Sequence, residues 1–156
     1  MRDKIVFFDI DYTLFNTDSF KKSGLTQHKN YDEVESILKL VSEEALLGVF
    51  SEGDREFQLE KLKKTQIYKY FSPEYIFIVE SKVDELKTLL EIKNKSRIFF
   101  VDDRLSILSD IKKILPEALV IWVKRGIYAK ENKVLDFLPD YSIDNLETLQ
   151  DIIKAN

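Results

Sequence analysis

The chain of 156 residues contains no cysteine and a single histidine, His28. Without cysteine, the protein has no disulfide, no thiol nucleophile and no thiolate-bound zinc or iron–sulfur cluster. One histidine is too few for the two-histidine zinc helix of metalloproteases or for a histidine-rich metal site. Any chemistry must therefore be carried out by carboxylates, hydroxyl groups and lysines.

An excess of positive charge and long apolar segments are also missing. The chain has 28 acidic and 24 basic residues, for a net charge of −4, whereas general nucleic-acid binders present a basic face. The first apolar run, residues 5–8, is ended by Asp9 and Asp11, so it is too short for a signal sequence or a membrane span. The absence of cysteine fits the reducing cytoplasm, which is where we expect the protein.

Glycine and proline are scarce, with four and three residues respectively. That leaves little room for linkers, and the sequence has no internal repeat and no low-complexity segment. A length of about 150 residues is usual for one domain. We therefore expect a single domain over residues 1–156.

Short β-rich runs alternate with amphipathic segments along the chain. Most of the runs are continuously apolar, which is typical of strands covered on both faces. They are residues 4–8, 46–50, 75–79, 97–101, 119–123 and, more weakly, 141–143. Between them, apolar residues recur at helical spacing in segments 34–41, 83–90 and 105–115. Asp144 and Glu147 have the spacing of a capping box before a last helical segment that includes Leu149 and Ile152.

This alternation predicts an α/β fold with a mainly parallel central sheet, right-handed crossovers and helices on both faces. In such a sheet, ligands bind beyond the carboxyl ends of the strands. Polar side chains follow each of the first four predicted strands. They are Asp9 and Asp11 after the first, Ser51, Glu52 and Gly53 after the second, Lys82 just past the third, and Asp102 and Asp103 after the fourth.

Together these residue types indicate phosphoryl transfer. An ionised carboxylate such as Asp9 can attack phosphorus without a base, although carboxylate and phosphate are both anions. Carboxylates from two strand ends can hold Mg²⁺, which offsets this repulsion. A lysine, a hydroxyl group and backbone N–H groups can hold the phosphate oxygens. Asp11, two residues after Asp9, should reach the same crevice and protonate the leaving oxygen.

The same motifs resemble those of the haloacid dehalogenase (HAD) superfamily, which includes Mg²⁺-dependent phosphohydrolases. The family has Asp-x-Asp-x-Thr after its first strand, here Asp9, Asp11 and Thr13. Its second strand is followed by Ser or Thr, here Ser51, and a lysine precedes a later helix, here Lys82. An acidic motif follows the fourth strand, here Val101-Asp102-Asp103-Arg104. The resemblance covers nearly the whole chain and implies a three-layer, Rossmann-like domain.

The resemblance also implies a role for each residue. Asp9 would form an aspartyl-phosphate, and Asp11 would act as general acid and then as base. Mg²⁺ would be held by Asp9, by the backbone carbonyl of Asp11 and by Asp102, and Asp103 would contact it through water or through another ligand. Phosphate would be bound by Ser51, Glu52, Gly53 and Lys82. An acid at position 11 is typical of the phosphatases and phosphomutases of the family, whereas its dehalogenases lack this acid.

The sequence departs from the family pattern in three places. Glu52 stands where many relatives have Asn, and Lys82 is followed by Val83 rather than the frequent Pro. The cap domain of most small-molecule phosphatases has no room here, because residues 12–30 suffice only for a flap with a hairpin and Glu80 and Ser81 close the other insertion point. An open site would admit bulky substrates, such as phosphoproteins or nucleic-acid ends, or small molecules if another subunit covers it.

Simpler structural explanations exist for several residues. Ser51 could cap a helix, and Lys82 could be a solvated lysine in a first helical turn. The charge run at Lys61, Lys63 and Lys64 is expected on a solvated helix face. His28 is expected to be a loop residue of the flap. The aromatic residues of the flap are expected to pack within it, although they could instead line the open mouth of the site or bind a partner. These aromatic residues are Phe15, Phe20 and Tyr31.

Two other functions stay open at this point. A receiver-type signalling domain also combines acids, a hydroxyl group and a lysine around a phosphoaspartate. Its phospho-acceptor follows the third strand and its lysine the fifth, an order that this chain does not have. A catalytically inactive, HAD-like scaffold is the second alternative, and the intact Asp9, Asp11 and Asp102 favour an enzyme over it.

Overall fold

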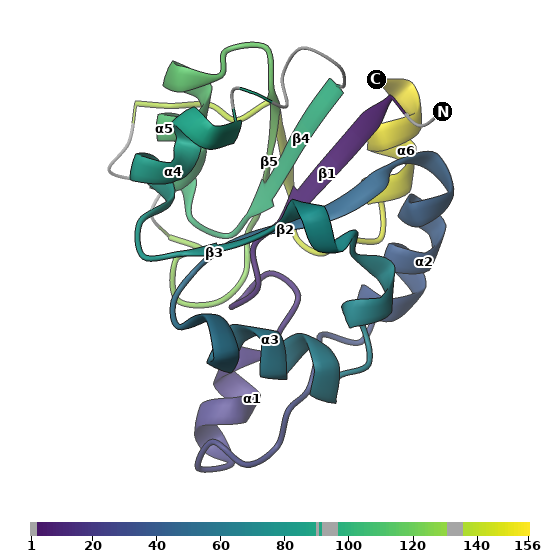
Figure 1. The fold of residues 1–156 in the computed structure, drawn as a ribbon, viewed down its shortest axis with the longest axis vertical. Helices are drawn as coiled ribbons and strands as arrows, with labels where there is room; N and C mark the ends of the chain where they lie inside the picture. The colour runs from purple at the N-terminus through teal and green to yellow at the C-terminus, as the bar shows by residue number, and fades with distance from the viewer. Residues whose placement is uncertain (1–2, 90, 92–96, 131–135) are drawn as a thin grey trace.

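A six-stranded sheet forms the centre of the computed structural model, which describes residues 3–89, 91, 97–130 and 136–156. All neighbouring strands are parallel, in the order β3-β2-β1-β4-β5-β6 (Figure 1). The strands are β1 (Lys4–Phe8), β2 (Leu46–Glu52), β3 (Ile76–Val79), β4 (Arg97–Asp102), β5 (Leu119–Val123) and β6 (Tyr141–Ile143). The predicted α/β fold with a parallel sheet is therefore confirmed, including all six strands.

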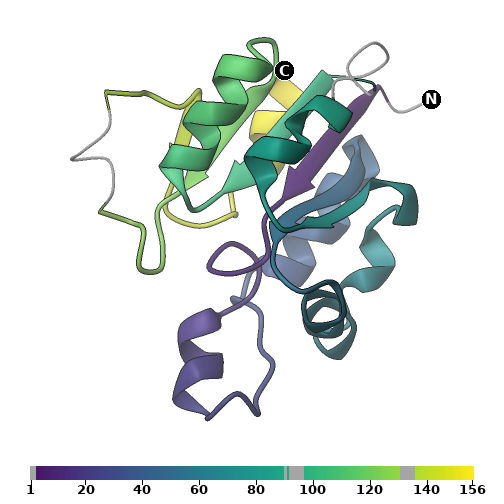
Figure 2. The same ribbon diagram turned by 60° about the vertical axis from the view of Figure 1, so that its left-hand side comes forward.

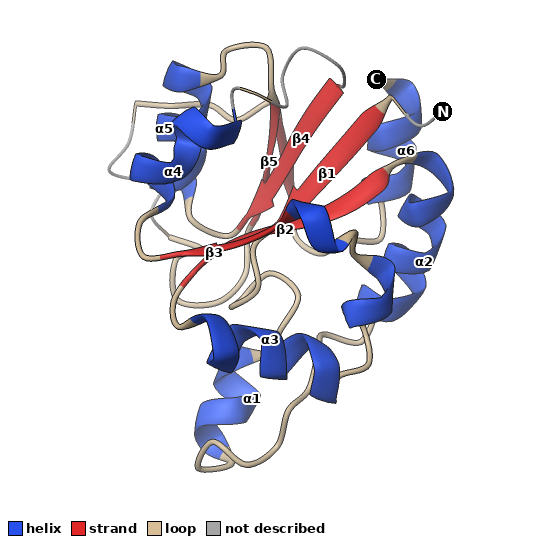
Figure 3. Cartoon of the chain, viewed as in Figure 1, coloured by secondary structure: helices blue, strands red, loops and turns tan. Residues whose placement is uncertain are grey.

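Helices cover both faces of the sheet (Figure 3). On one face lie α4 (Lys82–Leu89) and α5 (Leu105–Ile114), and on the other lie α2 (Val34–Glu44) and α6 (Leu149–Ala155). Beyond the carboxyl ends of the strands lie α1 (Thr17–Lys22) and α3 (Arg55–Lys64), and α1 projects from the sheet (Figure 2). Two 3₁₀ helices, Tyr68–Tyr70 and Pro73–Tyr75, lead into β3. None of the described helices is long and apolar enough to cross a membrane.

The continuous apolar character of β1 follows from its central position. Successive side chains of a strand point to opposite faces. Val6 and Phe8 accordingly belong to the core under α2 and α6, whereas Ile5 and Phe7 belong to the core under α4 and α5. Both faces are covered, so the positions from Ile5 to Phe8 are all apolar, and the next polar residue is Asp9, where the strand has ended.

The helical spacing of apolar residues correctly predicts α2, α4 and α5, although Leu90 of the predicted pattern lies outside the described residues. The predicted capping box is wrong. α6 begins at Leu149, its N-cap residue is Thr148, and no side chain caps it. The N–H of Glu147 instead donates to the Asn145 side chain over 2.9 Å. This turn lies between β6 and the helix, and Leu146 is buried within it.

Residues 12–30 and 80–81, all of which the structure describes, contain no cap domain. In place of the expected hairpin, the first segment holds α1 and an antiparallel bridge between Phe15 and Asn30. Phe15 and Phe20 are buried, and the His28 ring packs on Phe20 with 4.8 Å between the ring centroids. The predicted packing within the flap is confirmed for Phe15 and Phe20, and His28 lies in a loop of the flap, as predicted.

Candidate active site

The acidic motifs meet at the centre of the sheet. Asp9 directly follows β1 and Asp102 ends β4, and these two strands are parallel neighbours. From there the sheet continues through β2 on one side and through β5 on the other. The loops after β1 and β4 therefore diverge, which leaves a crevice at this point of a parallel sheet.

Three carboxylates cluster in this crevice. Oxygen atoms of Asp9, Asp102 and Asp103 lie within 4.8 Å of one another, and all three residues are buried. Burial, together with the charges of Asp9 and Asp102, raises the pKa of Asp103 to about 10. Burial also raises the pKa of Asp9 to about 6, although the Lys82 ammonium opposes this shift. In both groups the loss of hydration on burial is the main cause of the shift, and it disfavours the charged carboxylate.

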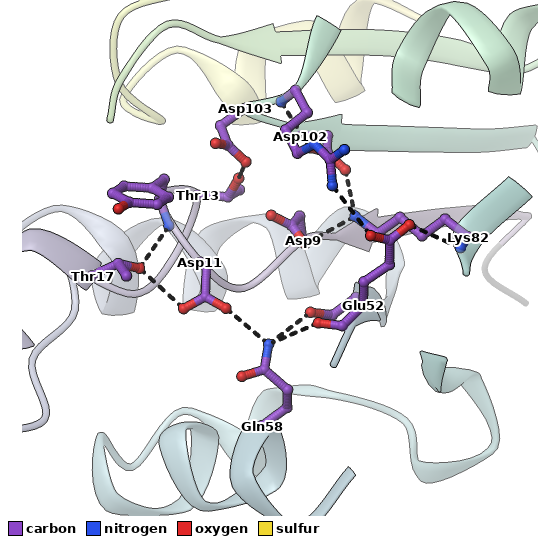
Figure 4. Close-up of polar contacts among 12 residues, drawn as sticks. Asp9, Asp11, Thr13, Thr17, Glu52, Gln58, Lys82, Asp102 and Asp103 are labelled. Carbon is purple, nitrogen blue, oxygen red and sulfur yellow. Dashed lines mark hydrogen bonds and ion pairs between the residues drawn. The ribbon is translucent and has the colours of Figure 1, made fainter. Parts of the chain in front are cut away.

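Lys82 supplies one positive charge to the cluster. Its Nζ donates to Oδ1 of Asp9 over 2.9 Å and to Oδ2 of Asp102 over 2.5 Å (Figure 4). Burial alone would lower the pKa of Lys82, but the adjacent Asp102 and Asp9 carboxylates raise it above its usual value. Lys82 is thus a buried ammonium at the first residue of α4 and not a solvated lysine.

The acidic cluster also fits a divalent metal ion. Oδ2 of Asp103 is buried and has no hydrogen-bond partner. Unpaired carboxylate oxygens from two strand ends are the ligands that hard cations such as Mg²⁺ prefer. A cation there would balance the negative charge of the carboxylates that Lys82 does not neutralise. Of the four predicted metal ligands, Asp9, Asp102 and Asp103 form this cluster, and the Asp11 side chain is not part of it.

Asp11 lies in the same cavity as Asp9 but in different surroundings. Its Oδ1 accepts hydrogen bonds from the Thr17 hydroxyl over 3.0 Å and from Nζ of Lys61 over 2.7 Å. Its Oδ2 accepts a hydrogen bond from Nε2 of Gln58 over 3.0 Å (Figure 4). The sequence did not single out Thr17 or Gln58. One signal was present, because Gln58 and Lys61 are three residues apart on a helix and must share a face.

The prediction that Lys61 lies on a solvated helix face is wrong, although it holds for Lys63 and Lys64. Lys61 is 4% exposed, because its face of α3 is turned toward the flap. Its ammonium group lies over the rings of Phe15, Phe20 and Phe57, at 5.2, 5.9 and 4.6 Å from their centroids. A charge run in sequence cannot reveal which of its members faces another segment.

The residues at the carboxyl end of β2 link the neighbouring strand ends. Ser51 is a β2 residue and not a helix cap, and its Oγ accepts a hydrogen bond from Gln58 over 3.0 Å. The Glu52 carboxylate accepts hydrogen bonds from the N–H of Lys82 over 3.1 Å and from the Arg104 side chain over 3.2 Å. Gly53 has φ of +137° and donates its N–H to Val79.

A cavity of about 430 Å³ opens over the acidic cluster. Five of the predicted site residues line it, namely Asp9, Asp11, Glu52, Lys82 and Asp103. The other three, Ser51, Gly53 and Asp102, are not part of its lining. The remaining lining residues are mainly aromatic, apolar or basic. They are Tyr12, Thr17, Phe20, Lys21, Leu25, Phe57, Lys61, Arg104, Ile127 and Tyr128.

No protein-family model matches the chain, and no curated protein is similar to it in sequence. Solved structures are similar in fold. A haloacid dehalogenase-like hydrolase from Burkholderia xenovorans superposes with a TM-score of 0.83 and 15% identity, over 97% of each chain. The chain therefore has the HAD-like fold, as its motifs predicted.

Two further solved structures have the same fold. The Bacillus subtilis HAD-hydrolase YfnB, determined with bound magnesium, has a TM-score of 0.71 and 12% identity and covers 99% of this chain and 100% of its own. An L-2-haloacid dehalogenase from Xanthobacter autotrophicus has a TM-score of 0.68 and 11% identity, over 99% of each chain. At these identities the likeness concerns the fold alone, so the reaction must be argued from the site.

Arg125, which follows β5, holds the loop after β1 in place. Its guanidinium group donates hydrogen bonds to the Thr13 carbonyl and to Oε1 of Glu33, and it stacks on Tyr31 at 3.7 Å from the ring centroid. The Thr13 hydroxyl in turn donates to Oδ1 of Asp103 over 3.4 Å. Arg125 thereby connects the region before α2 to the acidic cluster.

The Glu33–Arg125 contact should stabilise the fold in a pH-dependent way. Burial alone would raise the pKa of Glu33, but the hydrogen bond from Arg125, the charge of Arg125 and hydrogen bonds from backbone N–H groups together outweigh it, and the pKa is lowered. A lowered pKa in the folded state means that this stabilisation is complete above the usual glutamate pKa of about 4.5 and is lost at lower pH. We expect Glu33→Gln to lower the free energy of unfolding by about 1–3 kcal/mol at neutral pH.

Urea denaturation of wild type and Glu33→Gln, at neutral pH and well below the usual glutamate pKa, measures this effect. The difference between the two proteins should shrink in acid. The exposed Glu35 of the same region provides the matched control, since Glu35→Gln should change little at either pH. An equal loss for Glu33→Gln at both pH values would contradict the prediction.

Proposed function

We propose that the protein is a Mg²⁺-dependent phosphatase that hydrolyses phosphomonoesters through an aspartyl-phosphate on Asp9. The observation that supports this most directly is the buried cluster of Asp9, Asp102 and Asp103, with the Lys82 ammonium on two of its members. The HAD-like fold and the predicted motifs agree with it. The magnesium bound to one protein of this fold supports the choice of metal.

Each residue then has a defined task. A carboxylate oxygen of Asp9 attacks phosphorus while the bond between phosphorus and the substrate alcohol breaks, and Asp11 gives the alcohol its proton. Asp11 next takes a proton from water, whose oxygen attacks phosphorus and releases Asp9 and inorganic phosphate. When bound, Mg²⁺ supplies positive charge that offsets the repulsion between carboxylate and phosphate. Lys82 adds to that charge and orients Asp9.

Asp11 favours a phosphatase over a dehalogenase. A halide leaves without a proton, whereas the alkoxide of a phosphate ester needs a proton donor close by. Asp11 lines the cavity beside Asp9, and three side chains hold its two oxygens. These contacts hold the Asp11 carboxylate at a fixed position beside Asp9, as proton transfer to the leaving alcohol requires.

The loop after β2 is proposed to bind the phosphate. The Ser51 hydroxyl accepts a hydrogen bond from Gln58, which leaves its own hydrogen free to donate to a phosphate oxygen. The Glu52 carboxylate is paired with the Arg104 guanidinium and accepts a hydrogen bond from the backbone N–H of Lys82, so we propose that it fixes the loop instead of repelling the substrate. Gly53 provides the positive φ with which the loop turns away from β2.

We further propose that the protein acts as a single domain whose flap, residues 12–30, takes the place of a cap. The open cavity would then accept a phosphate on a bulky molecule, such as a phosphoprotein or a nucleic-acid end. A small substrate would need a second subunit to cover the cavity, because an open site excludes water poorly.

Phosphate release from p-nitrophenyl phosphate tests the proposed activity. Wild type should release phosphate only when Mg²⁺ is present, and Asp9→Asn should reduce the rate by about a thousandfold or more, because the nucleophile is lost. Asp9→Asn should still fold, since a buried carboxylate with a raised pKa costs stability that the neutral amide does not. The exposed Asp144 provides the control, and Asp144→Asn should keep full activity.

No Mg²⁺-dependent release would contradict the proposal, provided that the panel includes phosphopeptides, 5′- and 3′-phosphorylated oligonucleotides, sugar phosphates and nucleotides. That outcome would favour the inactive scaffold.

Metal binding has a readout that does not depend on activity. Mg²⁺ should raise the midpoint of thermal unfolding of wild type, because a ligand that binds only the folded state stabilises it. The rise should be much smaller in Asp102→Asn, which removes one carboxylate of the cluster, and unchanged in Asp144→Asn. Equal rises in all three proteins would mean that Mg²⁺ binds elsewhere.

Lys61 is expected to position Asp11 for proton transfer. Lys61→Met keeps an unbranched chain among the aromatic rings but removes the 2.7 Å contact to Asp11, so kcat should fall about tenfold. Lys61→Arg should restore part of the rate. Lys64→Met, on the exposed side of the same helix, should leave kcat unchanged. The prediction fails if Lys61→Met and Lys64→Met have the same kcat.

A further inference from the structure

Exposed apolar side chains gather at the mouth of the active-site cavity. Among the described residues, six large apolar side chains are exposed, and three of them, Leu25, Phe57 and Ile127, line this cavity. Their exposed fractions are 57%, 42% and 61%. Single apolar residues on a surface need no explanation, but several that converge on one cavity indicate a binding surface.

The three residues come from separate segments that are fixed against one another. Leu25 belongs to the flap, Phe57 to the first turn of α3, and Ile127 to the loop after β5. A Cβ atom at Gly126 would lie 2.3 Å from the Tyr12 ring, so only glycine lets this loop pack on the flap so closely. The mouth is therefore one continuous surface.

The backbone is held in an unfavourable conformation at two points of this mouth. Tyr12 and Leu25 have φ of 60° and 65°, and they are two of the three non-glycine residues with positive φ in the described chain. Both line the cavity. Such conformations persist only where the surrounding structure imposes them, and they are concentrated at functional sites.

Basic groups lie among these apolar residues. Nζ of Lys21 donates a hydrogen bond to the Tyr12 hydroxyl over 3.1 Å, and the Arg104 guanidinium lies over the Tyr128 ring at 5.3 Å. Both groups line the cavity and can attract a phosphate dianion. The exposed apolar side chains have no polar group to offer, so the hydroxyl groups of a sugar would lose hydrogen bonds to water there without replacement.

We infer that the ligand of this cavity is a phosphomonoester whose alcohol carries an apolar aromatic ring, and that the ring lies against Leu25, Phe57 and Ile127. This ligand is either a small aryl or arylmethyl phosphate or the phosphotyrosine side chain of a peptide. A planar ring gains from burial against such side chains and from contact with aromatic rings such as Phe57. The inference rests on the proposed function for the place of the phosphate group.

Calorimetry with Asp9→Asn in the presence of Mg²⁺ tests the inference without turnover. The two probes are 2-naphthylmethyl phosphate and glucose 6-phosphate, which are both phosphates of primary alcohols. The naphthyl ligand should bind about tenfold more tightly or better, because it buries apolar surface at the mouth. Equal affinities, or no binding of either probe, would overturn the inference.

Variants of the mouth locate the ring. Phe57→Ser combined with Ile127→Ser, in the Asp9→Asn background, should remove most of this preference and leave the affinity for inorganic phosphate unchanged. Leu138 is the most exposed of the six residues and does not line the cavity, so Leu138→Ser should keep the preference. An undiminished preference in the double variant would overturn the inference.

Two further comparisons complete the test. One distinguishes a small ligand from a peptide as the source of the ring, and the other distinguishes the ring site from the proposed hydrolysis. Free phosphotyrosine and a phosphotyrosine peptide should both bind more tightly than phosphoserine, and the tighter of the two identifies the source. A dimer that dissociates in the double variant, without a ring preference, would mean that the mouth binds a second copy instead. If wild type releases no phosphate from any probe while the ring preference holds, the proposed hydrolysis fails and the ring site remains.

Discussion

The structure depends on one electrostatic constraint, the balance of three carboxylates buried at the end of two central strands. Asp9, Asp102 and Asp103 would repel one another and resist burial if nothing opposed their charge. The Lys82 ammonium meets two of them, but burial still raises the pKa values of Asp9 and Asp103, so the ammonium does not fully offset the cost of burying the cluster. This arrangement is compatible with a bound cation, and the proposed function places Mg²⁺ and a phosphate there.

Asp9 and Asp11 lie two residues apart and yet have different environments. Asp9 is buried beside other carboxylates, whereas the Asp11 side chain is 32% exposed and is held by an ammonium, an amide and a hydroxyl group. Two carboxylates with separate surroundings can take separate roles, one as nucleophile and one as proton carrier. Lys61 and Gln58 both belong to α3, so the helix that follows the proposed phosphate-binding residues also surrounds Asp11.

Much of the fold and part of the site could be predicted from the sequence. The strands are continuous apolar runs because both faces of the sheet are covered, and the carboxyl end of a parallel sheet is where Asp9, Lys82 and Asp102 must meet. The prediction failed where the determining contact lies far away in the chain. Lys61 resembles its solvated neighbours in sequence, and only the packing of α3 on the flap buries it. The spacing of Asp144 and Glu147 likewise does not show that the helix starts only after Leu146, which is buried in the preceding turn.

The sequence by itself determined the order of strands and helices, the absence of a cap and the residues at four strand ends. These properties depend on local periodicity, on segment length and on the rule that parallel strands bring their carboxyl ends together. Only the tertiary structure decided which groups surround each acid and what forms the mouth of the cavity. Leu25, Phe57 and Ile127 are unremarkable surface residues until the flap, α3 and the loop after β5 come together. Contacts between such distant segments depend on the packing of the whole chain, which no local pattern encodes.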